Sequence, residues 1–535
     1  MTINKVYMRR FVSLRVTSTE TLGISLFLLP LVVLFLAEVI LSFQWRIQHD
    51  TPYLHYVAFM LDQTNSVLYR DVFEVNVPGI YLFHLAIWEV AGAGDLAFRI
   101  IDIFWLAALL SVTWALMRRF DTRVAWLSVI LFGLSYFHHG PDIILQRDYL
   151  GLLPVALAVL LAANPSRFSI PLRFVLVGLL FGLAVSIKPH LLTGMPLVLY
   201  YGWHRIPRTG PDSTAPGPSV STVVAICVFS AMGLLAPLLA QVLWLWVQGS
   251  IGDAVDIYSS YLPLYASVTG GHQTISGVDR IVYLVTSYIG LSNLGLWLIP
   301  ASLGVFVAAF GANATSQKKQ LVYLLAGLAV IYSIHPVLAG KFWSYHWLPF
   351  QYFLVIVASI GVVAVLDHRR LWSGRFISLL AVGLLFCALM LHPPREFFQQ
   401  LNGSLPAPNN GRVDEIAGYL KANLGPNDTV QPLDTSGGAL HAMLISRARV
   451  ATSFQEDYFF YHHVSDPFIQ SLRSRFVQEL RQTRPRFIID VETSRVWPSG
   501  PGTTREFHEV RELLDAQYVQ AFIGEGYLIY ERKPE

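Results

Sequence analysis

The sequence predicts an α-helical polytopic membrane protein, with about 11 transmembrane helices and a C-terminal soluble α/β domain. Its 535 residues are 54% hydrophobic and only 14% charged, with a mean hydropathy of +0.50. A soluble globular protein carries about 25% charged residues. The charge is also unevenly distributed, because residues 1–391 hold 40 charged side chains and residues 392–535 hold 33. The net charge of +3 predicts no surface for nucleic acid.

A helix of about 20 apolar residues spans the roughly 30 Å hydrocarbon core of a bilayer. The candidate spans are 22–44, 97–117, 124–141, 148–164, 171–187, 190–204, 219–248, 290–311, 319–338, 346–366 and 374–391. We therefore expect a membrane module over residues 1–391. A second, extracytoplasmic domain is expected over 392–535, beginning at His392-Pro393-Pro394.

The basic residues predict the orientation, because Lys and Arg concentrate in cytoplasmic loops. They cluster at 5–15, 118–123, 167–173, 205–208, 318–319 and 369–375. All of these clusters lie on one side if 78–92 is a helix in the membrane interface rather than a span. The N-terminus is then cytoplasmic, and the 392–535 domain faces outward from the cytoplasmic (inner) membrane. Most carboxylates of the membrane module fall on that outer side, where we expect any chemistry.

The first outer loop, about 45–96, contains a helix signal and an acidic residue at its start. Tyr53, Tyr56, Val57 and Met60 recur at helical spacing, which predicts an amphipathic helix lying on the membrane. Asp50 precedes it. The carboxylate either caps this helix or, because it emerges directly from the first span, has a functional role.

Further candidate residues follow in the outer loops. Arg70 and Asp71 could simply pair at a surface, and Asp148 could be stabilised by the dipole of its helix. Alternatively, Asp50 and Asp148 at one depth could bind a metal or supply a base. The candidates for binding in these two loops are Tyr69, Arg70, Asp71, Glu74, Asn76 and Arg147.

Four basic residues also face outward, against the general charge bias: Lys188, Arg280, Lys341 and His346. They could be interfacial anchors whose stems lie along apolar surface. Cations beside an interfacial cavity would also suit an anionic phosphate or pyrophosphate group.

In their order and topology these residues resemble the GT-C glycosyltransferases, specifically the protein O-mannosyltransferases and bacterial aminoarabinose lipid A transferases. The resemblance covers most of 20–390. Its matching features are Asp50 after the first span, YRDVFEVNVPGIYLFH at 69–84, Arg147-Asp148 and Lys188-Pro189. The Pro-Pro-Leu segment of that branch reads Val77-Pro78-Gly79 here. The Glu-Lys of the aminoarabinose enzymes has no clean match, Glu74 and Asn76 being nearest.

The resemblance implies transfer of a sugar from a polyprenyl-phosphate donor in the bilayer to a lipid, glycan or protein acceptor on the outer face. It implies that Asp50 is the base on the acceptor hydroxyl and that Asp148 is the second acidic residue. No cofactor is assigned, and a divalent metal on Asp50 and Asp148 stays open. The alternatives are a lipid-carrier transporter or flippase, which would need polar or broken helices at mid-depth, and a noncatalytic subunit of envelope polysaccharide assembly.

The outer domain alternates helix and strand signals. We expect helices at 412–424, 466–484 and 506–516, and strands at 429–433, 486–491 and within 518–531. Such alternation predicts a small α/β domain, whose role the sequence leaves open.

Overall fold

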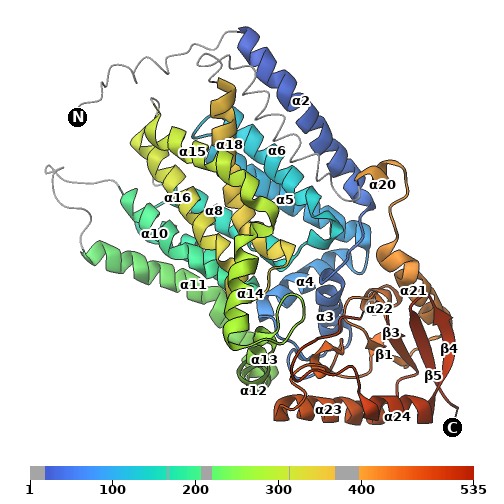
Figure 1. Ribbon diagram of the computed structural model, residues 1–535. Helices are drawn as coiled ribbons and strands as arrows, with labels where there is room; N and C mark the ends of the chain where they lie inside the picture. Colours follow the sequence, from blue (N-terminus) through green and yellow to red (C-terminus); the bar gives the residue numbers. More distant parts are fainter. Residues whose placement is uncertain are drawn as a thin grey trace.

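A computed structural model describes residues 18–164, 168–206, 220–311, 314–367, 397–493 and 495–534. The chain is mostly helical, with a small sheet near its C-terminal end (Figure 1). Six helical segments of the described residues are long and apolar enough to cross a membrane. They are Asp95–Met117, Ile170–Ile187, Val220–Gln248, Gly277–Phe310, Ser316–Ala339 and Ser344–Leu366. These correspond to six of the eleven predicted spans.

Of the other five predicted spans, three are short or divided helices, one coincides with a described helix, and one lies outside the described residues. α6 (Thr122–His138) has 17 residues. The predicted span 148–164 is divided at Gly151 into α7 (Arg147–Leu150) and α8 (Leu152–Ala162), and 190–204 into η3 (Pro189–Gly194) and α10 (Met195–His204). The first span coincides with α2 (Ser18–Leu41) and the short η1 (Ser42–Gln44) that follows it, and Leu29–Gln44 forms an apolar helical stretch across the two. The span 374–391 and the predicted domain boundary lie outside the described residues.

The bundle is held together by close helix pairs. α9 (Ile170–Ile187) packs along α11 (Val220–Gln248), and α15 (Leu298–Phe310) along α18 (Leu348–Asp367). Where α9 and α11 cross, Gly178 faces the backbone of Ser230, and Gly233 faces that of Val175, with no space for a Cβ atom. Small residues allow this approach between apolar helices. The remaining bundle helices are α5 (Asp95–Met117), α14 (Gly277–Ile289), α16 (Ser316–Ser333) and α17 (His335–Ala339).

The first loop forms two helices, α3 (Thr51–Gln63) and α4 (Pro78–Ala91). α4 matches the helix predicted at 78–92. α3 forms where the apolar stripe predicted a helix, but nine of its thirteen residues are buried, so it is packed on most sides and lacks the half-exposed surface that was predicted. The reason is that the C-terminal part of the chain covers it, and the Tyr56 hydroxyl donates a hydrogen bond to the Ala448 carbonyl at 2.7 Å.

The C-terminal part is a five-stranded mixed sheet with strand order β2-β1-β3-β5-β4. β1 (Thr429–Leu433) pairs in parallel with β2 (Arg449–Val450) and β3 (Phe487–Val491), and β5 (Tyr527–Arg532) runs antiparallel to β3 and to β4 (Tyr518–Gly524). Its helices are α21 (Arg412–Asn423), α22 (Ala439–Ser446), α23 (Pro467–Thr483) and α24 (His508–Gln517), after a short α20 (Phe397–Leu401). Each predicted helix and strand of this region is present, within two residues at most ends.

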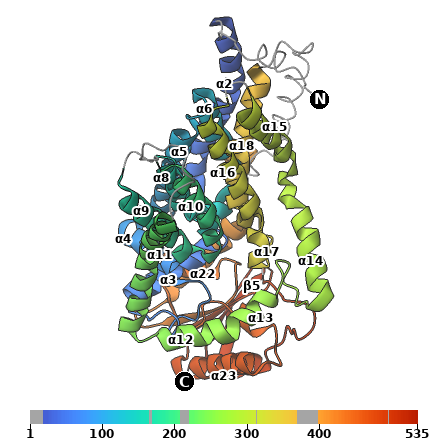
Figure 2. The same ribbon diagram turned by 90° about the vertical axis from the view of Figure 1, so that its left-hand side faces the viewer.

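This sheet region docks on the loop end of the bundle. Figure 2 shows α12 (Ile251–Asp256) and α13 (Leu262–Ser267) between the bundle and α23. Arg46, directly after the first span, pairs with Asp414 at 2.8 Å, and the Phe73 amide donates to the Ser453 carbonyl at 2.8 Å. The C-terminal region therefore lies at the same end of the molecule as Asp50.

Candidate active site

A cavity of about 480 Å³ lies where the bundle, the first loop and the C-terminal region meet. Side chains from all three parts line it. The polar ones include His49, Asp50, Glu74, Asn76, Arg147, Lys188, Tyr265, Lys341, His346, Ser436 and Glu456. Its size suits a small ligand or the reacting end of a larger one.

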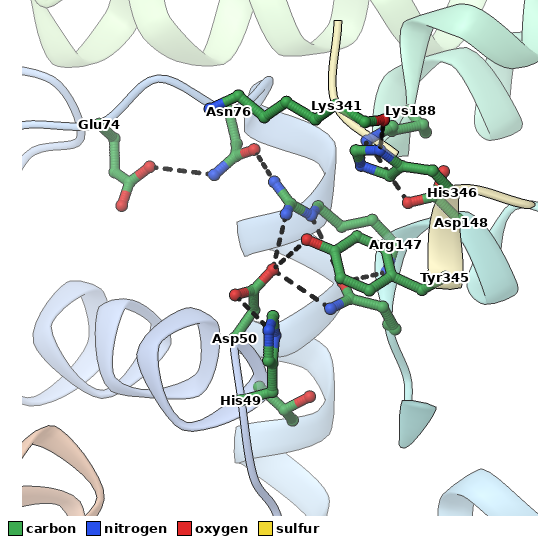
Figure 3. Close-up of polar contacts among 12 residues, drawn as sticks. His49, Asp50, Glu74, Asn76, Arg147, Asp148, Lys188, Lys341, Tyr345 and His346 are labelled. Atoms are coloured by element: carbon green, nitrogen blue, oxygen red, sulfur yellow. Dashed lines mark hydrogen bonds and ion pairs between the residues drawn. The ribbon is translucent and has the colours of Figure 1, made fainter. Parts of the chain in front are cut away.

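Asp50 occupies the position before α3 where a helix cap would stand, but its side chain makes no capping hydrogen bond. The carboxylate instead pairs with His49 Nδ1 at 2.9 Å and with Arg147 Nη2 at 2.8 Å (Figure 3). It also accepts from Tyr345 at 3.3 Å, and its side chain remains 29% exposed. His49 has a φ of +56°, an unfavourable conformation for a residue with a side chain. This backbone places Nδ1 of His49 against the carboxylate.

These contacts fix the charge of Asp50. Burial alone would raise the pKa of its carboxyl, but the charges of His49 and then Arg147 hold that pKa well below its ordinary value. The same ion pair raises the pKa of His49 to about 9. Asp50 is therefore an ionised, partly accessible carboxylate at neutral pH, ready to accept a hydrogen bond from a hydroxyl group.

Asp148 lies behind the cavity wall and is fully buried. Its carboxylate accepts a hydrogen bond from His335 Nε2 at 2.6 Å and pairs with Lys188 Nζ at 3.4 Å. Lys188 itself lines the cavity, and its Nζ is 3.4 Å from His346 Nε2. Asp148 thus acts on the cavity through Lys188, whose position and charge it stabilises.

Lys341 is a buried cation without a counter-charge in contact. Lys341 is 3% exposed, and its Nζ has no hydrogen-bond partner among the described residues. Nζ lies 3.4 Å from the centroid of the Tyr265 ring and 5.0 Å from that of Trp343. Burial lowers the pKa of Lys341 to about 7. Because an unpaired buried ammonium is costly, this position favours an anionic ligand.

Glu74 is a buried acidic group on the first-loop side of the cavity, whereas Lys341 is a buried basic group. It is fully buried, accepts hydrogen bonds from Tyr81 and from the Val75 amide, and its Oε1 has no partner among the described residues. Burial raises the pKa of Glu74 to about 7. Asn76 connects it to the rest of the site, since Nδ2 donates to Glu74 and Oδ1 accepts from Arg147.

The structure brings together seven of the twelve residues that the sequence singled out: Asp50, Glu74, Asn76, Arg147, Lys188, Lys341 and His346. Tyr69 stands behind them, donating to the Asn76 carbonyl at 2.6 Å. Arg280 is bound to the Ala266 carbonyl at 2.9 Å and does not reach the cavity.

Arg70 and Asp71 are also placed away from the cavity. Their side chains are 49% and 43% exposed and pair with each other at 3.2 Å. This is the surface pairing that the sequence allowed as the simpler alternative.

Sequence reasoning did not single out Glu456, Tyr345 or His335. Glu456 belongs to the C-terminal region, and burial, followed by the nearby charges of Glu74 and Asp50, holds its pKa well above the ordinary value. No local signal distinguishes Glu456 from the neighbouring Asp457, which pairs with Arg495 at 3.0 Å. Only the docking of the sheet region shows which carboxylate faces the cavity.

The residues proposed for a divalent metal do not fit one. Asp50 and Asp148 are held separately, each by its own cationic partners. Across the described parts of the chain, no group of three His, Cys, Asp or Glu side chains is arranged to hold an ion.

The fold and the cavity define a class of protein: a multi-pass helical chain with a sheet region docked over its first loop, in a fold like that of ArnT. ArnT from Cupriavidus metallidurans bound to undecaprenyl phosphate is similar, with a TM-score of 0.52 and 12% identity, covering 96% of this chain and 100% of its own. ArnT of the same organism in the apo state gives a TM-score of 0.56 and 11% identity, covering 97% and 100%.

No protein-family model and no curated protein sequence matches the chain. At 11–12% identity the likeness to ArnT concerns the fold. The resemblance to the aminoarabinose lipid A transferases is confirmed at that level, over nearly the whole length of the chain.

Proposed function

We propose that this protein is a membrane glycosyltransferase that moves a sugar from a polyprenyl-phosphate donor to a lipid, glycan or protein acceptor. The observation that carries this proposal is that one cavity holds both an ionised carboxylate, at Asp50, and an ammonium group without a hydrogen-bond partner among the described residues, at Lys341. A base for a hydroxyl group and a cation for a phosphate are the two groups that this transfer needs. The fold is also that of ArnT, which has been seen bound to undecaprenyl phosphate.

The chemical step is a displacement at the anomeric carbon. The acceptor oxygen forms a bond to this carbon while the bond from the carbon to the phosphate oxygen breaks. The electron pair of the broken bond leaves with the polyprenyl phosphate, and the acceptor proton passes to the Asp50 carboxylate. Lys341 and Lys188 stabilise the charge on the departing phosphate, and a single displacement of this kind inverts the anomeric centre.

The proposal includes an orientation in the membrane. Residues 1–391 form the membrane module with a cytoplasmic N-terminus, and 392–535 form an outer domain of the cytoplasmic membrane. This is supported by the charge pattern of the loops. It also agrees with the docking of the C-terminal region at the Asp50 end, where the donor phosphate and the acceptor would meet.

Sugar transfer by the purified protein in detergent tests the proposal. Radiolabelled polyprenyl-phosphate sugars serve as donors, and envelope lipid and glycan extracts as acceptors. We expect label to appear in an acceptor fraction, with one polyprenyl phosphate released for each sugar moved. Passage of intact donor across liposomes, without any transfer, would instead support the lipid-carrier transporter. Activity of a complex that needs neither Asp50 nor Lys341 would support the noncatalytic subunit.

Donor binding should weaken as the pH rises above about 7. The Lys341 ammonium is the binding form, and with a pKa of about 7 it loses its proton across this range. The KM for donor should then rise by up to about tenfold per pH unit. The measurement is KM between pH 6 and 9.

Two variants identify the titrating group. Lys341→Arg keeps its charge throughout this range and should abolish the rise. Glu74→Gln should retain it, although Glu74 also titrates near pH 7. If Lys341→Arg shows the wild-type slope, another group controls donor binding.

Glu456 should contribute to substrate binding from the C-terminal region. A carboxyl group that lines a cavity can exchange hydrogen bonds with sugar hydroxyls, and losing one from a buried site costs about 1–3 kcal/mol. Glu456→Ala should therefore lower kcat/KM about 5- to 150-fold. Glu506→Ala is the matched control, because Glu506 is exposed and its carboxylate pairs with His508 at 3.0 Å. Equal kinetics for the two variants would restrict the C-terminal region to a structural role.

A further inference from the structure

A second cavity, of about 700 Å³, lies at the other end of the bundle. The two ends are far apart, because α5 begins at Asp95 beside the C-terminal region and continues for 23 residues, about 34 Å, to Met117. The lining residues come from the ends of α5, α8, α10 and α16. They include the cationic residues Arg118, Arg119, Arg205 and Lys318.

Four of these lining residues are cationic and none is acidic. Arg119 donates to the Ala163 carbonyl at 2.6 Å and to the side chain of Asn164, both uncharged. Arg205 Nε is buried without a hydrogen-bond partner among the described residues. The nearby Asp121 carboxylate is bound by Arg123 at 3.1 Å and interacts at longer range with Lys318. This one carboxylate balances only part of the positive charge of the four cavity residues.

The cations also repel one another. Burial lowers the pKa of Arg119, and the charges of Arg205 and Arg118 lower it further. A role in membrane orientation alone would require Lys and Arg in these loops, but would not require residues from three separate helices to meet at one cavity. Ala115, Leu160 and Leu321 add an apolar part to the same wall. A hollow with cations and apolar side chains fits an anionic headgroup and the start of its acyl chains.

We propose that this cavity binds the phosphate-bearing headgroup of an anionic phospholipid. In the orientation proposed above it faces the cytoplasmic leaflet, where anionic lipids attract basic residues. The site is separate from the sugar-transfer cavity, so its occupation does not depend on Asp50.

Native mass spectrometry of the full-length protein in detergent tests this site, with phosphatidylglycerol, phosphatidylcholine and inorganic phosphate as probes. Wild type should bind phosphatidylglycerol in preference to phosphatidylcholine. The double variant Arg205→Gln/Lys318→Gln removes two of the four cations and should weaken phosphatidylglycerol binding about 25-fold, at about fivefold per charge. The control Lys319→Gln/Lys421→Gln removes the same charge outside the cavity and should bind like wild type.

The outcomes separate the sources of phosphate. Equal weakening in both double variants, or no preference over phosphatidylcholine in wild type, would overturn the site. Displacement of the lipid by inorganic phosphate would overturn the lipid headgroup in favour of free phosphate. If the double variant does not fold, Arg118→Gln decides, because Arg118 is exposed, and a loss of about fivefold is expected from this single charge.

Discussion

Asp50→Asn should reduce sugar transfer about 10²- to 10⁴-fold, the contribution of a positioned general base. The amide has the shape of the carboxylate but cannot take the acceptor proton. It also removes the negative charge that Arg147 and His49 contact at 2.8 and 2.9 Å. The pKa of His49, now about 9 because of Asp50, should fall toward its ordinary value. The measurements are kcat/KM for transfer and the His49 titration by NMR.

The control for this variant is Asp256→Asn, which changes an exposed carboxylate at the end of α12. It should transfer sugar at the wild-type rate. Thermal unfolding of both variants distinguishes a lost base from a lost fold. Retention of more than a tenth of the wild-type rate in a folded Asp50→Asn protein would place the base elsewhere.

Lys341→Met should change activity and stability in opposite directions. Transfer should fall about 10²- to 10³-fold, because the cation that stabilises the departing phosphate is lost. The Tm should stay level or rise, because Lys341 Nζ has no hydrogen-bond partner among the described residues and an apolar side chain of similar length replaces a buried charge. A residue that served only packing or folding would not combine a loss of transfer with an unchanged or higher Tm.

Lys188→Met provides the contrast. Lys188 pairs with Asp148, so its removal leaves a buried carboxylate without this cation. Breaking a buried pair from one side costs about 3–5 kcal/mol, and this variant should lose both activity and stability. If Lys341→Met is destabilised as strongly as Lys188→Met while transfer continues, the phosphate-binding role of Lys341 is wrong.

Local pattern predicted those parts of the fold that depend on neighbouring residues. Turn residues predicted the helix beginning at Pro78-Gly79, and an apolar run predicted the strand at 487–491. The environment of α3 was not, because the region that buries it lies almost 400 residues further along the chain, at Ala448. The division of two predicted spans, at Gly151 and near Gly194, could not be predicted for a different reason. The residues on both sides of each break are apolar, so hydropathy does not mark the break.

The sequence predicted which residues belong to the candidate site, but it did not predict which of them contact one another. Asp50 and Arg147 were both identified, yet their ion pair joins residues 97 positions apart. Arg70-Asp71 has the same residue types as Arg147-Asp148 but lies at the surface. Glu456 lies in another part of the chain, and its role depends on how the sheet region docks.

A structure of the protein with polyprenyl phosphate bound tests the central claim most directly. We predict the phosphate within hydrogen-bond distance of Lys341 Nζ, inside the cavity that Asp50 lines, with Lys188 beside it. The space between the phosphate and the Asp50 carboxylate should admit a sugar ring. A phosphate bound outside this cavity, or inside it without contact to either lysine, would contradict the account.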